Sequence, residues 1–397
     1  MEKFKLPFFD FFDRNLLLLF VSFLLLGLIM VYSATLPLPS DNERHFFWNQ
    51  MRGHQIHLIL GVLVFFIFLH IPTEILKSFS GALFAFGLSL LFCVGLLKFF
   101  GGQDFIRDGA VRSIPLGPIT LQPAEPMKFF SILFASAYAI RRNDRIRDSL
   151  INGIAPIGFL MCILIVFLLY QPDLGSTIVI TLTVGAILFL GGMNLRVFIP
   201  LFLGLCLFFV CMIIFTDWRL DRLLSFVTPC DQEFSANVGY QLCAALVAFG
   251  NGGLFGTGLG TGVAKLDYLP LPHTDFIFAV IGEELGFVGI SLVLVGFYFL
   301  IKRSIEIGRI AMSQERIFAG LVAQGIGFWI GIQAFIHAGV NTGILPTKGL
   351  TLPFISHGGS SLLVVCMAMG VLFRIDMENK IFSKQNLLNL NTQVKAR

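Results

Sequence analysis

Four ionisable residues crowd the stretch "LPLPHTDFIFAVIGEELG" at 269–286. His273 and Asp275 stand directly before a long apolar run, and Glu283 and Glu284 lie inside it. Acids within an apolar run are costly unless they are paired or face a cavity, so these two glutamates are predicted to hold neighbouring helices together or to line a polar interior. Asp275, at the mouth of the run, could act as a general base. The alternative is that Asp275 caps the following helix, whose N-terminus would make the carboxylate a weaker base.

A second charged pair lies in "LQPAEPMKFF", where Glu125 and Lys128 are three residues apart. On a helix this spacing makes the two side chains neighbours on one face. At the entrance of an apolar span such a pair should face protein or water rather than lipid. The pair is predicted to line a substrate site, and the alternative is an ion pair that ties the preceding loop to the helices.

The composition places these residues in a membrane. Hydrophobic residues make up 56% of the 397 residues, 13% are charged, and the mean hydropathy is +0.84. An average soluble domain has about 25% charged residues. The chain is therefore predicted to be one domain, 1–397, an all-α polytopic integral membrane bundle of about ten transmembrane helices. Runs of roughly 17–25 apolar residues, the length that crosses the hydrocarbon, lie at approximately 15–34, 54–71, 78–97, 126–140, 151–170, 176–193, 196–215, 276–301, 316–338 and 360–374.

The positions of Lys and Arg orient this bundle. Most of the 28 lie on one side of the spans, and the "RRNDRIR" turn at 141–147 is the strongest group. By the positive-inside rule this side is cytoplasmic, and an even number of spans puts both termini there. Three longer segments then lie outside the membrane, the largest of them between helices 7 and 8: 98–125, 216–275 and 339–358.

The outer segments carry basic residues that topology does not explain. Arg and Lys bind phosphate groups well, so an anionic ligand arriving from outside is one explanation. Ordinary solvation of loops and local ion pairs are the other. The residues are Arg107, Arg112, Lys128, Arg219, Arg222, Lys265 and Lys348.

Other kinds of site find no support in the sequence. The glycine-rich segment 249–262 has neither a G-x-G-x-x-G nor a P-loop pattern, so its glycines are predicted to pack backbones closely or to form a buried re-entrant turn. No group of His, Cys, Asp and Glu has the spacing of metal ligands, so no built-in metal or cofactor is predicted, and nothing indicates nucleic acid. Cys230 and Cys243 share the large outer loop; a disulfide is open to them, but unpaired small apolar residues are preferred.

Four motifs resemble those of a known family: "QPAEPMK" at 122–128, "GYQLCAALVAFGNGGLFGTGLG" at 239–260, "LPHTDFIFAVIGEELGFVG" at 271–289 and "GVNTGILPTKGLTLPFISHGGSS" at 339–361. In this order and topology they are similar to the SEDS family, named for shape, elongation, division and sporulation. The resemblance runs from the first span to the last. The fourth motif is closer to the division branch of the family than to the elongation branch.

The resemblance implies a peptidoglycan glycosyltransferase that polymerises lipid II at the outer face of the bacterial cytoplasmic membrane, at the division septum. It implies that Asp275, in the H-T-D-F motif, takes the proton from the acceptor sugar hydroxyl. The implied partners are a class B penicillin-binding protein, other membrane proteins of cell division, lipid II and membrane lipid. A divalent cation could enter with the pyrophosphate of the substrate. Substrate contacts are predicted for Gln122, Glu125, Lys128, Arg112, Arg222, His273, Lys348 and Ser360.

Two other functions stay open at this point. A lipid II flippase would suit a bundle with intramembrane acids, and a non-catalytic scaffold could recruit a transpeptidase. The unexplained polar residues gather at one face, which favours the enzyme. His357, where the family has Tyr, is interpreted as a packing residue rather than a proton carrier. The departures from the family pattern, which bear on substrate detail, are Ser113, Pro126, Leu271, His337 and His357.

Overall fold

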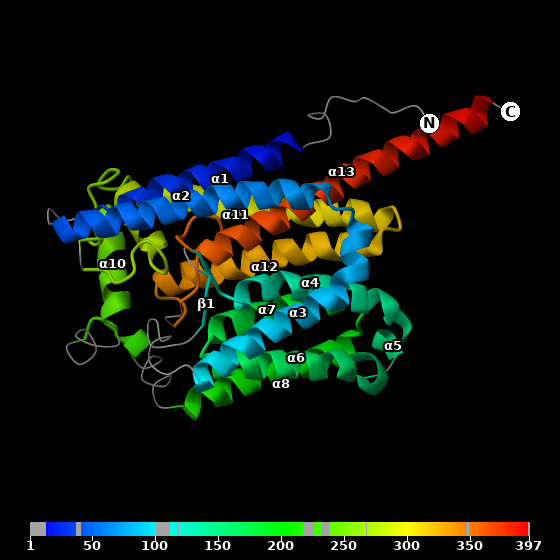
Figure 1. The fold of residues 1–397 in the computed structure, drawn as a ribbon, viewed down its shortest axis with the longest axis horizontal. Helices are drawn as coiled ribbons and strands as arrows, with labels where there is room; N and C mark the ends of the chain where they lie inside the picture. Colours follow the sequence, from blue (N-terminus) through cyan, green and yellow to red (C-terminus); the bar gives the residue numbers. More distant parts are fainter. Residues whose placement is uncertain are drawn as a thin grey trace.

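The helices lie side by side in one elongated bundle (Figure 1). This computed structural model describes residues 13–36, 41–100, 112–116, 119–148, 150–216, 225–231, 239–266, 268–346 and 349–395. The helices are α1 (Arg14–Ala34), α2 (Asp41–His70), α3 (Thr73–Phe100), α4 (Ala124–Arg141), α5 (Asn143–Asp148), the π-helical η3 (Leu150–Ile154), α6 (Ala155–Tyr170), α7 (Leu174–Leu190), α8 (Leu195–Ile214), α10 (Tyr240–Gly252), α11 (Ile277–Ser313), α12 (Ile317–Asn341) and α13 (Gly359–Lys395).

Each of the ten predicted spans falls on a helix, so the predicted all-α membrane bundle is confirmed. Within the described ranges, eight helices are long and apolar enough to cross a membrane, α7 is apolar but shorter, and α4 carries charge. The helices α2, α11 and α13 run well past their predicted limits. The thickness of the hydrocarbon limits the length of an apolar run but not of a helix, which can continue into water.

The centre of the bundle is formed by α4, α12 and α13. Of the apolar part of α12 and of α13, 78% is buried inside the protein, whereas the value for α8 is 0%. On α4, both Glu125 and Lys128 are buried along with most of the helix. Protein rather than lipid surrounds α4, and this explains how a spanning helix can carry two charges.

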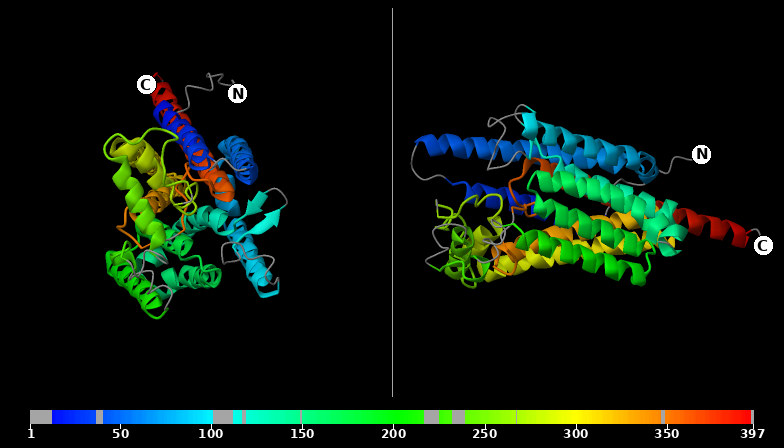
Figure 2. Two further views of the ribbon diagram at one scale, coloured as in Figure 1. Left: turned by 90° about the vertical axis from the view of Figure 1, so that its left-hand side faces the viewer. Right: turned by 90° about the horizontal axis from the view of Figure 1, so that it is seen from below.

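The predicted loop 98–125 contains a small hairpin that the sequence analysis did not foresee. Strand β1 (Ile114–Leu116) pairs antiparallel with β2 (Ile119–Leu121), with Ile114 opposite Leu121. Figures 1 and 2 show the hairpin at the same end of the bundle as α10, and we call this the hairpin end. At the opposite end, which we call the terminal end, α1 begins and α13 projects beyond the other helices.

Helix α11 is interrupted at Gly286, where φ is 68° and ψ is −167°. The glycine-rich loop that follows α10 contacts it there. The Thr257 N–H donates to the carbonyl of Glu283, and the Phe287 N–H donates to the carbonyl of Gly253, both at 2.9 Å. In an uninterrupted helix, Phe287 would donate to Glu283, four residues before it. The loop and α11 therefore exchange the hydrogen bonds that each would otherwise make within its own turn.

The exchange repeats one residue further along both segments. Gly258 donates to the carbonyl of Glu284 at 3.0 Å, and Val288 donates to the carbonyl of Leu254 at 3.1 Å. The two backbones come so close that a Cβ atom on Gly256 would lie 2.1 Å from the Glu284 carbonyl oxygen. This is the close backbone packing predicted for the glycine-rich segment.

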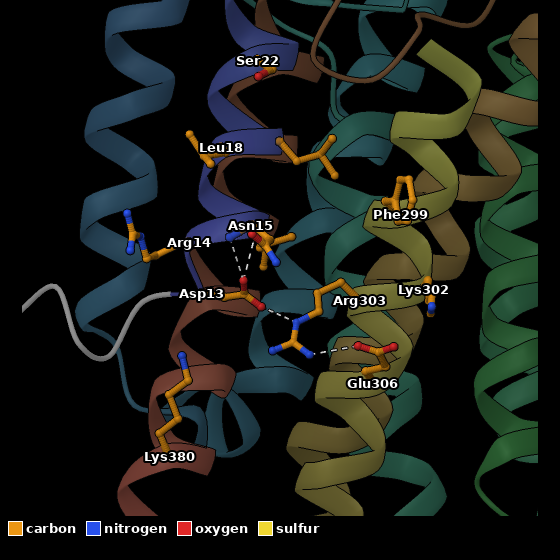
Figure 3. A pocket seen from close by; sticks show the side chains of 12 residues that line it. Asp13, Arg14, Asn15, Leu18, Ser22, Phe299, Lys302, Arg303, Glu306 and Lys380 are labelled. Carbon is orange, nitrogen blue, oxygen red and sulfur yellow. Dashed lines mark hydrogen bonds and ion pairs between the residues drawn. The ribbon is translucent and has the colours of Figure 1, made fainter. Parts of the chain in front are cut away.

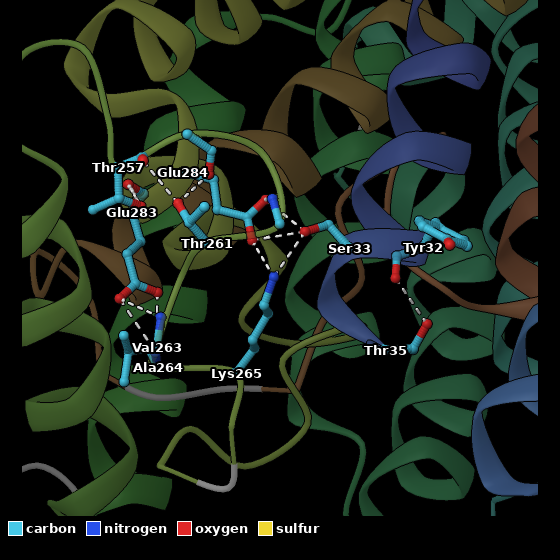
Figure 4. Close-up of polar contacts among 12 residues, drawn as sticks. Tyr32, Ser33, Thr35, Thr257, Thr261, Val263, Ala264, Lys265, Glu283 and Glu284 are labelled. Atoms are coloured by element: carbon cyan, nitrogen blue, oxygen red, sulfur yellow. Dashed lines mark hydrogen bonds and ion pairs between the residues drawn. The ribbon is translucent and has the colours of Figure 1, made fainter. Parts of the chain in front are cut away.

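The side chains of Glu283 and Glu284 also bind this loop (Figure 4). Glu284 accepts from Lys265 Nζ at 2.6 Å, from Ser33 of α1 at 2.6–2.7 Å and from the Gly260 N–H at 3.1 Å. Glu283 accepts from backbone N–H groups of the loop at 3.0–3.2 Å. The predicted role of holding neighbouring segments together is confirmed. Lys265 is buried and already paired with Glu284, so it is not available to bind an anion from outside.

Cys230 and Cys243 form a disulfide at the hairpin end, with their Cα atoms 5.1 Å apart. The preference for unpaired cysteines was therefore wrong. The sequence shows only that they lie thirteen positions apart, whereas the fold brings their backbones within the range of a disulfide.

Candidate active site

A cavity of about 380 Å³ lies at the hairpin end. Its wall comes from the hairpin, the start of α4, the segment before α11 and the segment around the start of α13, which are far apart in the sequence. The fold thus brings together five of the residues predicted for the site: Arg112, Gln122, Glu125, Asp275 and Ser360.

Asp275 lies on the cavity wall, two residues before α11. The helix begins at Ile277, and its N-cap is Phe276, which makes no side-chain cap hydrogen bond. The alternative that Asp275 caps this helix is therefore wrong. The Asp275 carbonyl accepts from Asn341 Nδ2 at 3.0 Å, which ties this backbone to α12. Gly349 packs against the carboxylate, since a Cβ atom there would lie 3.0 Å from Oδ2.

Glu125 and Lys128 form the predicted ion pair, at 2.7 Å, with both side chains buried. The Lys128 ammonium also donates to Gln333 Oε1 at 3.1 Å. Gln333 in turn accepts from the Trp329 indole and donates to the Thr351 carbonyl, both at 2.9 Å. Glu125 lines the cavity, whereas Lys128 lies behind it. Lys128 is therefore placed to orient Glu125, and its contact with phosphate stays a prediction.

Arg112 brings a cation to the wall and is held from behind. Its Nε donates to the carbonyl of Gln171 and a terminal nitrogen donates to that of Pro172, both at 3.1 Å. This turn is itself fixed, because the Gln171 amide donates to the carbonyl of Leu91 at 3.0 Å and Asp173 caps α7. Arg112 is thereby oriented toward the cavity, where a guanidinium suits phosphate oxygens.

Ser360 joins the start of α13 to the hairpin. Its hydroxyl accepts from the Gln122 N–H at 3.0 Å and donates to the carbonyl of Thr120 at 2.7 Å. Beside it, the hydroxyls of Thr351 and Ser361 are 2.8 Å apart. The Ser360 hydroxyl thus shapes the wall by internal hydrogen bonds, and its contact with substrate stays a prediction.

Four histidines gather beside the cavity. The ring centroid of His357 lies 5.6 Å from that of His273 and 5.4 Å from that of His54, and His57 lies against the start of α13. Burial, and then the nearby imidazoles of His54, His273 and His57, lower the pKa of His357 to about 3. Burial likewise lowers the pKa of His273. His357 lines the cavity, whereas His273 is only 8% exposed and lies behind the wall. Its contact with substrate stays a prediction.

Residues 13–381 match the family model for FtsW, RodA and SpoVE, described as "Cell cycle protein". The chain belongs to this family, the one called SEDS above. It is 42% identical over 376 residues to "Probable peptidoglycan glycosyltransferase FtsW" of Polynucleobacter necessarius subsp. necessarius (strain STIR1), covering 94% of this chain and 88% of the relative. It is also 42% identical over 369 residues to the protein of the same name from Coxiella burnetii (strain RSA 493 / Nine Mile phase I), covering 93% and 97%.

Solved structures of the family share the fold. The TM-score is 0.73, at 23% identity, to a chain from "Structural coordination of polymerization and crosslinking by a peptidoglycan synthase complex", covering 93% of this chain and 98% of that chain. It is 0.65, at 25% identity, to the rod shape determining protein RodA of Thermus thermophilus, covering 92% and 96%. With its apolar spanning helices, this SEDS member is an integral membrane protein.

Most departures of this chain from the SEDS pattern fall on or beside the cavity. Ser113, Leu271 and His357 are part of the wall. Pro126 lies in the first turn of α4, where its missing N–H costs little. His337 is buried in α12, and its Nδ1 lies 2.6 Å from the Leu350 carbonyl. These residues shape the cavity and leave Asp275 and the Glu125–Lys128 pair in place.

Arg222 and Lys348, and with them Arg107 and Arg219, lie outside the described residues. Within the described ranges, no group of three or more His, Cys, Asp and Glu could hold a metal ion.

Three polar residues behind the wall were missed in the sequence analysis: Gln333, His54 and His57. Gln333 is a lone amide within the apolar part of α12, and the two histidines are three residues apart at the start of an apolar span. A polar residue within a spanning helix is itself a sign of a cavity or a buried partner. That signal was present in the sequence.

We expect His357→Tyr to reduce the loss of thermal stability on acidification. In the unfolded chain this imidazole titrates near 6.5, whereas in the folded protein its pKa is about 3. As the pH falls from 7 to 5, the unfolded state takes up a proton that the folded state does not, so unfolding becomes easier. The measurement is the Tm of wild type and variant in detergent at both pH values.

The matched control for this comparison is His70→Gln. His70 is the last residue of α2, and its ring is exposed. It should keep the wild-type dependence of Tm on pH. An equal fall of Tm in wild type and His357→Tyr would contradict the assignment of a neutral, half-buried His357.

Proposed function

We propose that this protein is a peptidoglycan glycosyltransferase that polymerises lipid II at the outer face of the cytoplasmic membrane during cell division. The observation that carries the proposal is the position of Asp275 on a cavity wall that it shares with Arg112 and Glu125. A base, a cation and a carboxylate are what transfer from a sugar pyrophosphate requires. The names of the relatives and the extent of the similarity agree with it.

In the proposed reaction, Asp275 accepts the proton of the acceptor sugar hydroxyl while that oxygen attacks the anomeric carbon of the donor. The bond from the anomeric carbon to the pyrophosphate oxygen breaks, and the polyprenyl pyrophosphate leaves with the negative charge. One displacement of this kind inverts the anomeric carbon. Asp275 then returns its proton to water, because it is partly exposed.

The leaving group carries the largest negative charge, and cations at fixed positions stabilise it best. Arg112 is the described cation on the wall. Arg222 and Lys348, from the other outer segments, are proposed to join it when substrate binds. Glu125, held by Lys128, is proposed to accept hydrogen bonds from sugar hydroxyls, since its Oε2 makes none within the described residues. No built-in cofactor is proposed, and a divalent ion would arrive with the pyrophosphate.

The proposal requires the hairpin end to face outward and both termini to face the cytoplasm. The disulfide at the hairpin end supports this, because disulfides persist in oxidising compartments. The positive-inside rule supports it too. Basic residues in the described helices and turns at the terminal end include Arg14, Lys77, Arg141, Arg142, Lys302, Arg303, Arg316 and Lys380.

The proposed partner is a class B penicillin-binding protein that crosslinks the strands, with further division proteins of the inner membrane at the septum. The solved peptidoglycan synthase complex with a chain of this fold is described as coordinating polymerization and crosslinking. That description supports a partner of this kind for the present protein. We propose no nucleic acid partner.

The test is polymerisation of labelled lipid II by the purified protein in detergent, with and without the cognate penicillin-binding protein. Detergent micelles have no second leaflet, so polymer formed there cannot result from flipping. Glycan polymer that needs this protein would support the enzyme. If no polymer forms despite an active partner and intact substrate, the assignment moves to a flippase or a scaffold. An assay of lipid II transfer across the membrane of vesicles would then distinguish these two functions.

A further inference from the structure

A second cavity, of about 950 Å³, lies at the terminal end, between α1, α11 and α13 (Figure 3). Its lining shares no residue with that of the cavity around Asp275. The wall has a charged part and an apolar part, and neither has a task in glycosyl transfer. Four of its residues are basic: Arg14, Lys302, Arg303 and Lys380.

Two of the four basic residues are neutralised within the protein. Arg303 pairs with Asp13 and with Glu306, the latter at 2.9 Å. Lys380 pairs with Asp376 at 2.8 Å. The Asp13–Arg303 pair joins the start of α1 to α11, and Arg303 also lies 3.9 Å from Asp376 of α13.

The other two cations, Arg14 and Lys302, have no ion-pair partner within the described part of the chain. Both are exposed. In Figure 3 they lie on either side of the Asp13–Arg303 pair, Arg14 on α1 and Lys302 on α11. The cavity is therefore flanked by two positive charges that nothing in its described wall offsets, and the chemistry that complements them is an anion.

An exposed apolar side chain lies one helical turn from each of these cations. Leu18, four residues after Arg14, is 67% exposed, and Phe299, three residues before Lys302, is 53% exposed. Residues at these spacings share a helix face, and both apolar residues lie on the membrane side of their cation. The groove thus offers positive charge at its mouth and apolar surface toward the bilayer on both helices. A free anion would use only the first of these, whereas an anionic phospholipid uses both.

We infer that this groove binds an anionic phospholipid of the cytoplasmic leaflet, with its head group attracted by the charges of Arg14 and Lys302 and an acyl chain along the apolar side chains Leu18 and Phe299. Basic pockets between spanning helices on the cytoplasmic side suit such head groups. The bound lipid would bridge α1 to α11, the helix that follows Asp275 at the other end of the bundle. The inference concerns lipid binding and does not depend on the proposed glycosyl transfer.

The test measures binding to the full chain in detergent, by the rise of Tm and by native mass spectrometry, as phosphatidylglycerol is added. We expect saturation with about one lipid per protein, and no such rise with phosphatidylcholine of the same acyl chains or with inorganic phosphate. Removing one of the two charges, as in Arg14→Gln or Lys302→Gln, should raise the half-saturating lipid concentration about fivefold. Arg14→Lys keeps the charge and should bind nearly as wild type.

The matched control is Arg309→Gln, because Arg309 is an exposed cation of the same helix outside the groove. It should leave binding unchanged. An equal rise of Tm with phosphatidylcholine and with phosphatidylglycerol would overturn the proposal. So would an equal weakening of lipid binding by Arg309→Gln and by Lys302→Gln. Stabilisation by inorganic phosphate alone would do so too, since it would show an anion site that does not need the lipid. None of these readouts involves polymerisation, so failure here leaves the proposed function untouched.

Discussion

Asp275→Asn is expected to lower the rate of lipid II polymerisation by about 10²–10⁴-fold, the usual contribution of a general base. The substitution keeps the size of the side chain and removes its ability to accept a proton. The Asp275 backbone is fixed through its carbonyl, which accepts from Asn341, and Gly349 packs against the carboxylate group, whose size Asn retains. The fold should therefore persist, with a change in stability within about 0.5 kcal/mol.

The measurement is polymer formed per unit time at matched protein concentration, together with Tm. Asp231→Asn is the matched control, because Asp231 is an exposed carboxylate at the same end of the molecule, next to the disulfide. It should keep wild-type activity. More than a tenth of the wild-type rate in a folded Asp275→Asn variant would show that another group takes the proton.

Glu284→Gln is expected to destabilise the protein by about 3–5 kcal/mol, because it leaves a buried lysine without its counter-charge. The side chains of Glu284 and Lys265 are 0% and 1% exposed. Ser33 is the other described side chain that bonds the ammonium, at 3.0 Å, and a neutral hydroxyl cannot replace the carboxylate. The damage should reach both α1 and the glycine-rich loop, since Glu284 bonds each of them.

The free energy of unfolding in detergent, from denaturant titration, tests this expectation. The double variant Glu284→Gln/Lys265→Met removes both charges and should recover much of the loss. Glu74→Gln breaks an exposed pair with Lys77, at 3.5 Å, and should cost no more than about 1 kcal/mol. A loss below about 1 kcal/mol for Glu284→Gln would mean that water reaches this pair.

The membrane fold could be predicted from the sequence because each spanning helix is signalled by its own apolar run. The Glu125–Lys128 pair could also be predicted, because a spacing of three residues on one helix brings the two side chains together. The partner of Glu284 was not. Lys265 and Ser33 lie 19 and 251 residues away, and no local pattern encodes such a contact. For the same reason the sequence could suggest Lys128 as a substrate contact, although Gln333 of α12 draws it behind the wall.

The exchange of hydrogen bonds between the glycine-rich loop and α11 has a consequence for cooperativity. Neither segment can fray alone, because the amides of Thr257 and Phe287 are each held by a carbonyl of the other segment. If the loop detached, the carbonyl of Glu283 would lose its donor, and the break at Gly286 would keep α11 from supplying another. Residues thirty positions apart in sequence therefore open as a single unit. The first turns of α11, which follow Asp275, thus share the local stability of the glycine-rich loop.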